Sequence, residues 1–250
     1  MSRRLLMLVI ILASTVTAAH AQVRFRIATG LSTDWITNDN PAVYRLTGTG
    51  DPLDSEAGFG GGFDGVQFGW GLKGFADLDK QKILRIPFGI DYFNYHGAQA
   101  ILAPSYEITV THTVNMFTPY AGFEWSFVEF PLAYARAYIG AETRLTYLPS
   151  NEVRYQEWYA NGDTKDSTFS TKEAAARLGG MIRLGIEGEI YYPVFVNTSV
   201  AWGVMNLIGR DMRSTAEGGR GELLTASKLN ESGEGLIYHL NFTFMVQIRI

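Results

Sequence analysis

The chain has 250 residues, no cysteine and a formal net charge of −4 at pH 7. The lack of cysteine excludes disulfides, thiolate-bound metals and a lipid-modified cysteine at the start of the mature chain. The acidic balance argues against a nucleic-acid partner.

Residues 1–21 have the pattern of a cleaved signal peptide. Arg3 and Arg4 form a basic start, an apolar run follows over 5–13, and Ala19-His20-Ala21 is a small-residue cleavage site. The run is much shorter than the roughly 20 residues of a membrane-spanning helix, so cleavage is favoured over anchoring. We expect residues 22–250 to form one domain, because no linker-like stretch interrupts them.

Eight later segments alternate apolar and polar residues with a period of two, the pattern of β-strands with two unlike faces. They cover about 23–31, 63–76, 83–96, 108–127, 133–148, 175–191, 194–208 and 236–250. The fourth segment changes its apolar phase, which predicts a β-bulge near 116–119. In the last segment nearly every second residue is apolar, and from Tyr238 onward Met245 is the one apolar residue on the polar face.

The connections between these segments alternate in length. Those at about 32–62, 97–107, 149–174 and 209–234 are long, and those at 77–82, 128–132 and 192–193 are short. This sorting is typical of outer-membrane barrels, which have short periplasmic turns and longer extracellular loops. We therefore predict an all-β fold, a closed up-and-down antiparallel transmembrane β-barrel of eight strands. It would be integral to the outer membrane, with both termini in the periplasm.

An eight-stranded barrel has an interior that side chains fill, so the apolar face must point outward. The predicted lipid-facing residues are Phe68, Trp70, Leu72, Ile86, Phe88, Ile90, Ile182, Leu184, Ile186, Phe242 and Phe244. The predicted lumen charge network is Arg85, Asp91, Glu124, Arg136, Glu142, Arg144, Arg177, Arg183, Glu187 and Glu189, on stripes that also carry Arg24, Arg26, Lys73 and Arg249. Buried charges are costly unless paired, which favours an ion-paired plug. Aromatic residues near the strand ends, Phe93 and Tyr95 among them, predict two interfacial girdles.

In strand number, loop sorting and C-terminal strand, residues 22–250 resemble the small eight-stranded outer-membrane barrels of the OmpA transmembrane-domain and OmpX-like families. In those families the last strand is also an assembly signal for the barrel-insertion machinery. The resemblance implies that role for Phe242, Phe244, Val246, Ile248 and Ile250. The last residue departs from the aromatic that is usual there.

Candidate catalytic residues are few. A barrel enzyme that modifies outer-leaflet lipid would need a His-x-Ser pattern and an acid, whereas His112 is followed directly by Thr113 and no motif places an acid. The other histidines after the leader are His96 and His239. Zinc, calcium-loop and phosphate-loop patterns are lacking, and the glycine-rich run 58–65 has no following lysine and helix. We expect no catalytic residue, metal or cofactor.

Three functions stay open at this point. The sequence favours a non-enzymatic outer-membrane protein with a plugged lumen and four exposed loops, which bind an unknown ligand or stabilise the envelope. The same charges could instead line a narrow channel for small solutes. The third alternative is a lipid-modifying enzyme. The partners that the architecture implies are outer-membrane lipid and the insertion machinery.

Overall fold

The computed structural model describes residues 24–43, 60–78, 83–149, 151–170, 172–226 and 233–249. The predicted signal peptide and Ile250 lie outside the described residues. The elements are β1 (Arg24–Ile36), β2 (Gln67–Asp77), β3 (Leu84–Ala103), β4 (Tyr106–Phe130), η1 (Pro131–Ala133), β5 (Ala135–Leu148), β6 (Asn151–Tyr159), β7 (Thr164–Ser170), β8 (Ala175–Tyr191), β9 (Val194–Ile208), η2 (Thr215–Glu217) and β10 (Tyr238–Arg249). Within these ranges, no helix has the length and hydropathy needed to span a membrane.

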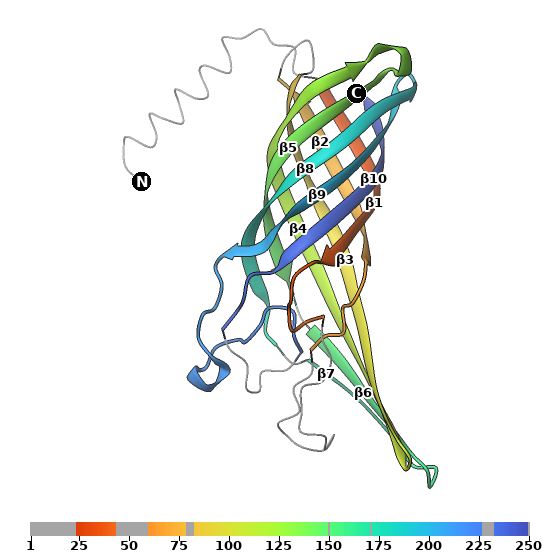
Figure 1. Cartoon of the computed structure of the whole chain (residues 1–250), viewed down its shortest axis with the longest axis vertical. Coiled ribbons are helices and arrows are strands. Elements are labelled where there is room, and N and C mark those ends of the chain that lie inside the picture. Colours follow the sequence, from red (N-terminus) through yellow and green to blue (C-terminus); the bar gives the residue numbers. More distant parts are fainter. Residues whose placement is uncertain are drawn as a thin grey trace.

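Eight strands form a closed antiparallel barrel (Figure 1). The order around the wall is β3-β2-β1-β10-β9-β8-β5-β4, and β4 pairs back with β3. A closed ring leaves no strand edge open in the wall, so the backbone polar groups pair within it. The predicted eight-stranded up-and-down barrel is confirmed. We call the end with the short turns and the C-terminus the turn end, and the opposite end the loop end.

Four strands continue beyond the loop end as a second structure, the protruding sheet. It consists of residues 94–103 of β3, residues 106–115 of β4, and the whole of β6 and β7, which are added in that order to β4. In Figure 1 these strands extend far past the barrel. Sequence analysis placed loops at 97–107 and 149–174, which is wrong. The part of β4 in this sheet lies within the predicted segment 108–127, whereas β6 and β7 were missed because their residues are mainly polar.

The predicted bulge near 116–119 is also wrong. From Tyr106 to Ser126, β4 keeps one alternation, and its register shift against β5 lies between Ser126 and Val128. The apolar residues of β4 lie on its inner face near the loop end and on its outer face further along, because the surroundings of the inner face change along the strand. At the loop end that face is covered by apolar loop residues, whereas inside the barrel it meets charges.

The loop end is closed by a cap, which we define as residues 37–43, 60–66, 209–226 and 233–237. Its segments are hydrogen-bonded to one another, for example from Phe63 N to Ala42 O at 3.0 Å. A buried apolar cluster joins the cap to the inner faces of the strands: Ile36, Ala42, Phe63, Phe93, Tyr95, Val114, Met116, Leu148, Ala175, Met205, Leu223, Leu224 and Ile237. Phe93 and Tyr95 are therefore wrongly assigned to an outward-facing girdle, because the cap supplies an apolar environment on the inside.

Candidate functional site

A connected network of ion pairs crosses the lumen. It contains six basic and five acidic side chains from β1, β2, β3, β4, β5 and β8: Arg26, Lys73, Asp77, Arg85, Asp91, Glu124, Arg136, Glu142, Arg144, Arg183 and Glu187. None of these side chains is more than 10% exposed. All point inward because alternate residues of each strand face the lumen.

Glu187 joins the charges nearest the turn end. Its carboxylate accepts hydrogen bonds from Arg26 Nη1 and from Arg85 Nη1 at 2.5 Å, and it lies 3.1 Å from Arg136 Nη2. Arg85 also binds Glu124, whose other oxygen accepts from Lys73 at 2.8 Å. One carboxylate thus offsets charge from three strands besides its own.

Glu142 has the same role closer to the loop end. Arg183 binds it through Nε at 2.7 Å and Nη2 at 3.0 Å, Arg144 Nη1 lies at 3.1 Å, and Lys73 Nζ lies at 3.5 Å. Arg183 also donates to Ser199 Oγ at 2.7 Å on β9. Hydrogen bonds to uncharged side chains therefore connect the network to strands that contribute no charge to it.

Aromatic rings fill the remaining space in the lumen. The guanidinium of Arg85 lies 4.4 Å from the ring centres of both Phe75 and Tyr138, within the range of cation–π attraction. Gly185 faces Tyr138, and a Cβ there would lie 2.4 Å from the ring. Glycine at this position leaves room for a large side chain opposite, so the lumen is filled rather than open at this level.

Most of the predicted lumen charges lie in the network, but two lie elsewhere. Arg177 is at the loop end, where it binds Glu234 of the cap. Glu189 lies half-buried at the turn end and makes no ion pair with a described residue. The alternation continues along β8 past both ends of the charged layer, so sequence periodicity could not show where that layer stops. Asp77 was missed because it was assigned to a turn.

The predicted lipid-facing residues all lie on the outside of the barrel, with exposed fractions from 37% to 66%. On β10, Phe242, Phe244, Val246 and Ile248 share this outer face. The barrel therefore has an apolar outer surface around a charged interior, the reverse of a water-soluble protein.

An acid–histidine pair lies between the network and the cap. Asp34 accepts a hydrogen bond from Tyr95 Oη at 2.7 Å, and its carboxylate lies 2.8 Å from His239 Nδ1. Catalytic triads use such a pair to activate a nucleophile. Here the pair is buried inside the barrel, and His239 Nε2 has no hydrogen bond to any residue that the structure describes. The geometry places it out of reach of lipid outside the wall.

His112, the candidate base in the sequence, belongs to the cap interface. It is fully buried, and its ring lies 5.0 Å from that of Phe63. Burial and the nearby charge of Lys172 lower the pKa of His112 to about 3. Among the described residues, no group of three or more histidines or carboxylates is arranged to hold a metal ion.

A cavity of about 350 Å³ opens at the turn end. Aromatic residues and charges line it, and its lining includes Arg136 and Glu187 of the network. The network therefore borders this cavity on the side of the barrel interior.

The sequence matches no protein-family model, and no curated protein is similar to it. Solved structures with a similar arrangement include Neisserial surface protein A, at 9% identity and a TM-score of 0.43, covering 90% of this chain and 97% of that one. Ail, the attachment invasion locus protein of Yersinia pestis, is 8% identical with a TM-score of 0.35, covering 91% and 99%. The outer membrane protein OprG from Pseudomonas aeruginosa is 10% identical with a TM-score of 0.36, covering 93% and 98%. The strand pairing of this chain establishes its barrel architecture without them.

Proposed function

We propose that the protein is an integral outer-membrane barrel that does not conduct and that displays the protruding sheet outside the cell as a binding surface. The observation that carries this proposal is the connected ion-pair network across the lumen, together with the cap above it. The turn end then faces the periplasm, and the apolar outer surface contacts lipid. No wide channel is expected in a barrel of eight strands, since side chains fill the interior.

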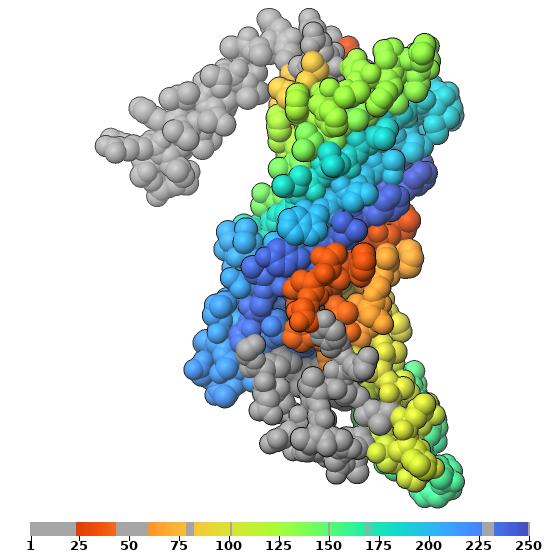
Figure 2. All heavy atoms as spheres, viewed as in Figure 1, coloured from red at the N-terminus to blue at the C-terminus, as the bar shows by residue number. Residues whose placement is uncertain are grey.

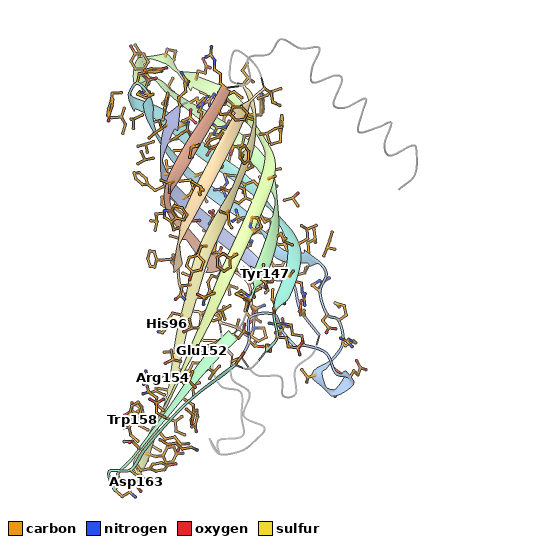
Figure 3. The ribbon with its side chains drawn as sticks, turned by 180° about the vertical axis from the view of Figure 1, so that it is seen from behind. His96, Tyr147, Glu152, Arg154, Trp158 and Asp163 are labelled. Atoms are coloured by element: carbon orange, nitrogen blue, oxygen red, sulfur yellow. The ribbon has the colours of Figure 1, made fainter. Side chains whose placement is uncertain are left out.

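The outer face of the protruding sheet supports a binding role. Figure 3 shows Glu152, Arg154 and Trp158 in order along β6, with Asp163 at the tip. Trp158 is 38% exposed although it stands in water. Tryptophan and arginine dominate the binding energy of protein interfaces, so a protein partner suits this face best.

The outer face is also held rigid. Arg154 Nη2 donates to Asp166 Oδ2 at 2.6 Å, and Gln156 Nε2 donates to the same oxygen at 3.1 Å. Both bonds link β6 to β7, which pairs only with β6 among the described strands. A surface whose side chains are already ordered loses less entropy when a partner binds.

Planar-bilayer recording tests the closed lumen. The parent protein is expected to give no stable openings. Steady openings of the parent, with an ion selectivity that changes in Glu187→Gln, would instead support the narrow channel. The variant must first show the gel shift on boiling that a folded barrel gives, so that leakage from misfolded protein is not counted.

Cell adhesion tests the binding surface. Cells that display the parent protein are expected to be retained on wells coated with a partner from a panel of purified extracellular proteins. Trp158→Ser should weaken retention by about tenfold or more, since loss of one interface tryptophan costs about 2 kcal/mol. Leu132→Ser, in a fully exposed turn at the opposite end, is the control. Equal retention of parent and Trp158→Ser would exclude this face.

A further inference from the structure

A second cavity, of about 330 Å³, opens at the loop end where β8 begins and the β9–β10 loop folds back beside it. Its charged lining residues come from these two segments: Glu173, Arg177, Asp211, Arg213 and Arg220. We call it the arginine cavity. Figure 2 shows the blue loop segment that forms one side of it, standing out from the barrel wall. It shares no residue with the protruding sheet, although its first lining residue, Glu173, follows soon after the end of β7 at Ser170.

Two of the three arginines are oriented by carboxylates. Arg177 donates through Nε to Glu234 at 2.7 Å and through Nη2 to the other oxygen of the same carboxylate. Arg213 donates through Nε at 3.0 Å and Nη2 at 2.9 Å to Asp211. Bidentate pairs of this kind fix the plane of each guanidinium.

Arg220 is bound differently. Its Nη1 donates to the backbone oxygen of Glu173, whose own side chain is exposed. Its Nε and Nη2 are buried and donate to no residue that the structure describes. These two atoms form one edge of the guanidinium, the edge that binds two oxygens of a carboxylate or phosphate at once.

An anion at this edge would offset two costs. Unsatisfied buried donors are unfavourable, and so is an arginine charge held away from water. Burial holds the pKa of Arg220 below its ordinary value; the negative charge of Glu234 opposes this shift, and the positive charge of Arg177 adds to it. A bound anion would supply acceptors for both donors and a charge of opposite sign.

We infer that the arginine cavity binds a phosphoryl group on the free edge of Arg220, with Arg177 and Arg213 beside it. A phosphoryl group has three outward oxygens and can meet several guanidinium groups from different directions, whereas a carboxylate has two oxygens in one plane.

Two sources could supply this group. Three exposed apolar residues are close in sequence to the lining: Leu207 and Ile208 at the end of β9, and Met212 between Asp211 and Arg213, at 55%, 60% and 66% exposure. We call them the apolar strip. With the orientation proposed above, that strip lies at the outer-leaflet surface, where phosphorylated lipid headgroups lie. The alternative source is a soluble phosphate. The cavity has the same chemistry for both.

Arginine Nε–H NMR signals of the protein in dodecylmaltoside micelles test the site. Inorganic phosphate is expected to shift the Arg220 signal in a saturable way, while sodium chloride at matched ionic strength leaves it in place. In Arg220→Gln and Arg220→Lys, the response of the Arg213 signal should need about tenfold more phosphate, because lysine keeps the charge but lacks the edge. Arg24→Gln, which alters an exposed arginine at the turn end, far from the cavity, should bind as the parent does.

Lipid nanodiscs separate the two sources. Discs of phosphatidylcholine with phosphatidic acid, whose phosphate is a terminal monoester with three outward oxygens, are compared with discs that contain diacylglycerol instead, where the choline diester is the only phosphate. A shifted Arg220 signal in the phosphatidic acid discs alone assigns a lipid headgroup. Unshifted signals in both discs, with a shift on adding inorganic phosphate, assign a soluble ligand. The proposal is overturned if neither probe shifts the signal, if chloride shifts it equally, or if Arg220→Gln keeps the parent affinity.

Discussion

Glu187→Gln is the sharpest perturbation of the lumen, because this carboxylate contacts three arginines. The substitution keeps the size of the side chain and removes its charge. Arg26 keeps Asp77 and Arg85 keeps Glu124, so the network would lose charge balance rather than all of its bonds.

The magnitude follows from burial. The Glu187 side chain is 4% exposed, and those of Arg26 and Arg85 are fully buried. Loss of one partner from a buried pair leaves an uncompensated charge and costs about 3–5 kcal/mol of unfolding free energy. The network already has one more basic than acidic group. Arg136→Gln should therefore cost clearly less than Glu187→Gln, because it removes a basic group from the side in excess and Glu187 keeps Arg26 and Arg85.

Reversible urea unfolding in detergent, followed by tryptophan fluorescence, measures these free energies. Asp166→Asn is the matched control, because it also changes an acid to its amide but in an exposed pair, where solvent screening leaves little or no loss of unfolding free energy. The reasoning is refuted if the unfolding free energy of Glu187→Gln lies within about 1 kcal/mol of that of the parent. It is also refuted if Arg136→Gln lowers the unfolding free energy as much as Glu187→Gln does.

Three further substitutions test the cap and the wall. Burial and the charge of Lys172 lower the pKa of His112 to about 3, so its neutral form stabilises the cap above pH 6.5, and that contribution is lost as the pH falls toward 3. The hydrogen-exchange protection factors of cap amides, which are corrected for the intrinsic pH dependence of exchange, should fall more on going to about pH 4.5 in the parent than in His112→Leu. Gly97→Ala should open the cap without unfolding the barrel, since the alanine Cβ would lie 1.9 Å from the backbone oxygen of Gly61 in the cap. Faster hydrogen exchange that is confined to the cap amides would show this effect. Leu184→Arg should lower the free energy of urea unfolding in lipid by about 2–4 kcal/mol, because it places a charge on the lipid-facing surface. Leu132→Arg, in an exposed turn, should leave that free energy almost unchanged. Equal losses would contradict the assignment of the outer surface.

The barrel could be predicted from sequence because lipid outside and charge inside impose the same alternation on every strand. The predicted segments 175–191 and 194–208 have the bounds of β8 and β9. The protruding sheet could not be predicted in this way. Its outer face carries polar residues such as Thr111 and Arg154, which are paired across β4 and β6 and give no apolar signal. The pairing of β6 with β4 is visible only once both strands are placed.

The charged residues of the site were visible in sequence, but their partners were not. Periodicity assigns a residue to a face, whereas ion pairing depends on height along the barrel, which the register of neighbouring strands sets. Arg177 and Arg183 lie on the same stripe of β8 and differ by six positions. Because of this separation along the strand, Arg183 forms an ion pair with Glu142 inside the barrel, whereas Arg177 forms one with Glu234 of the cap. The boundary between them is where apolar cap residues replace charges, and it is formed by loops that carry no periodic signal. One continuous stripe of the sequence therefore supplies both an ion-paired lumen and a cavity lined by arginines.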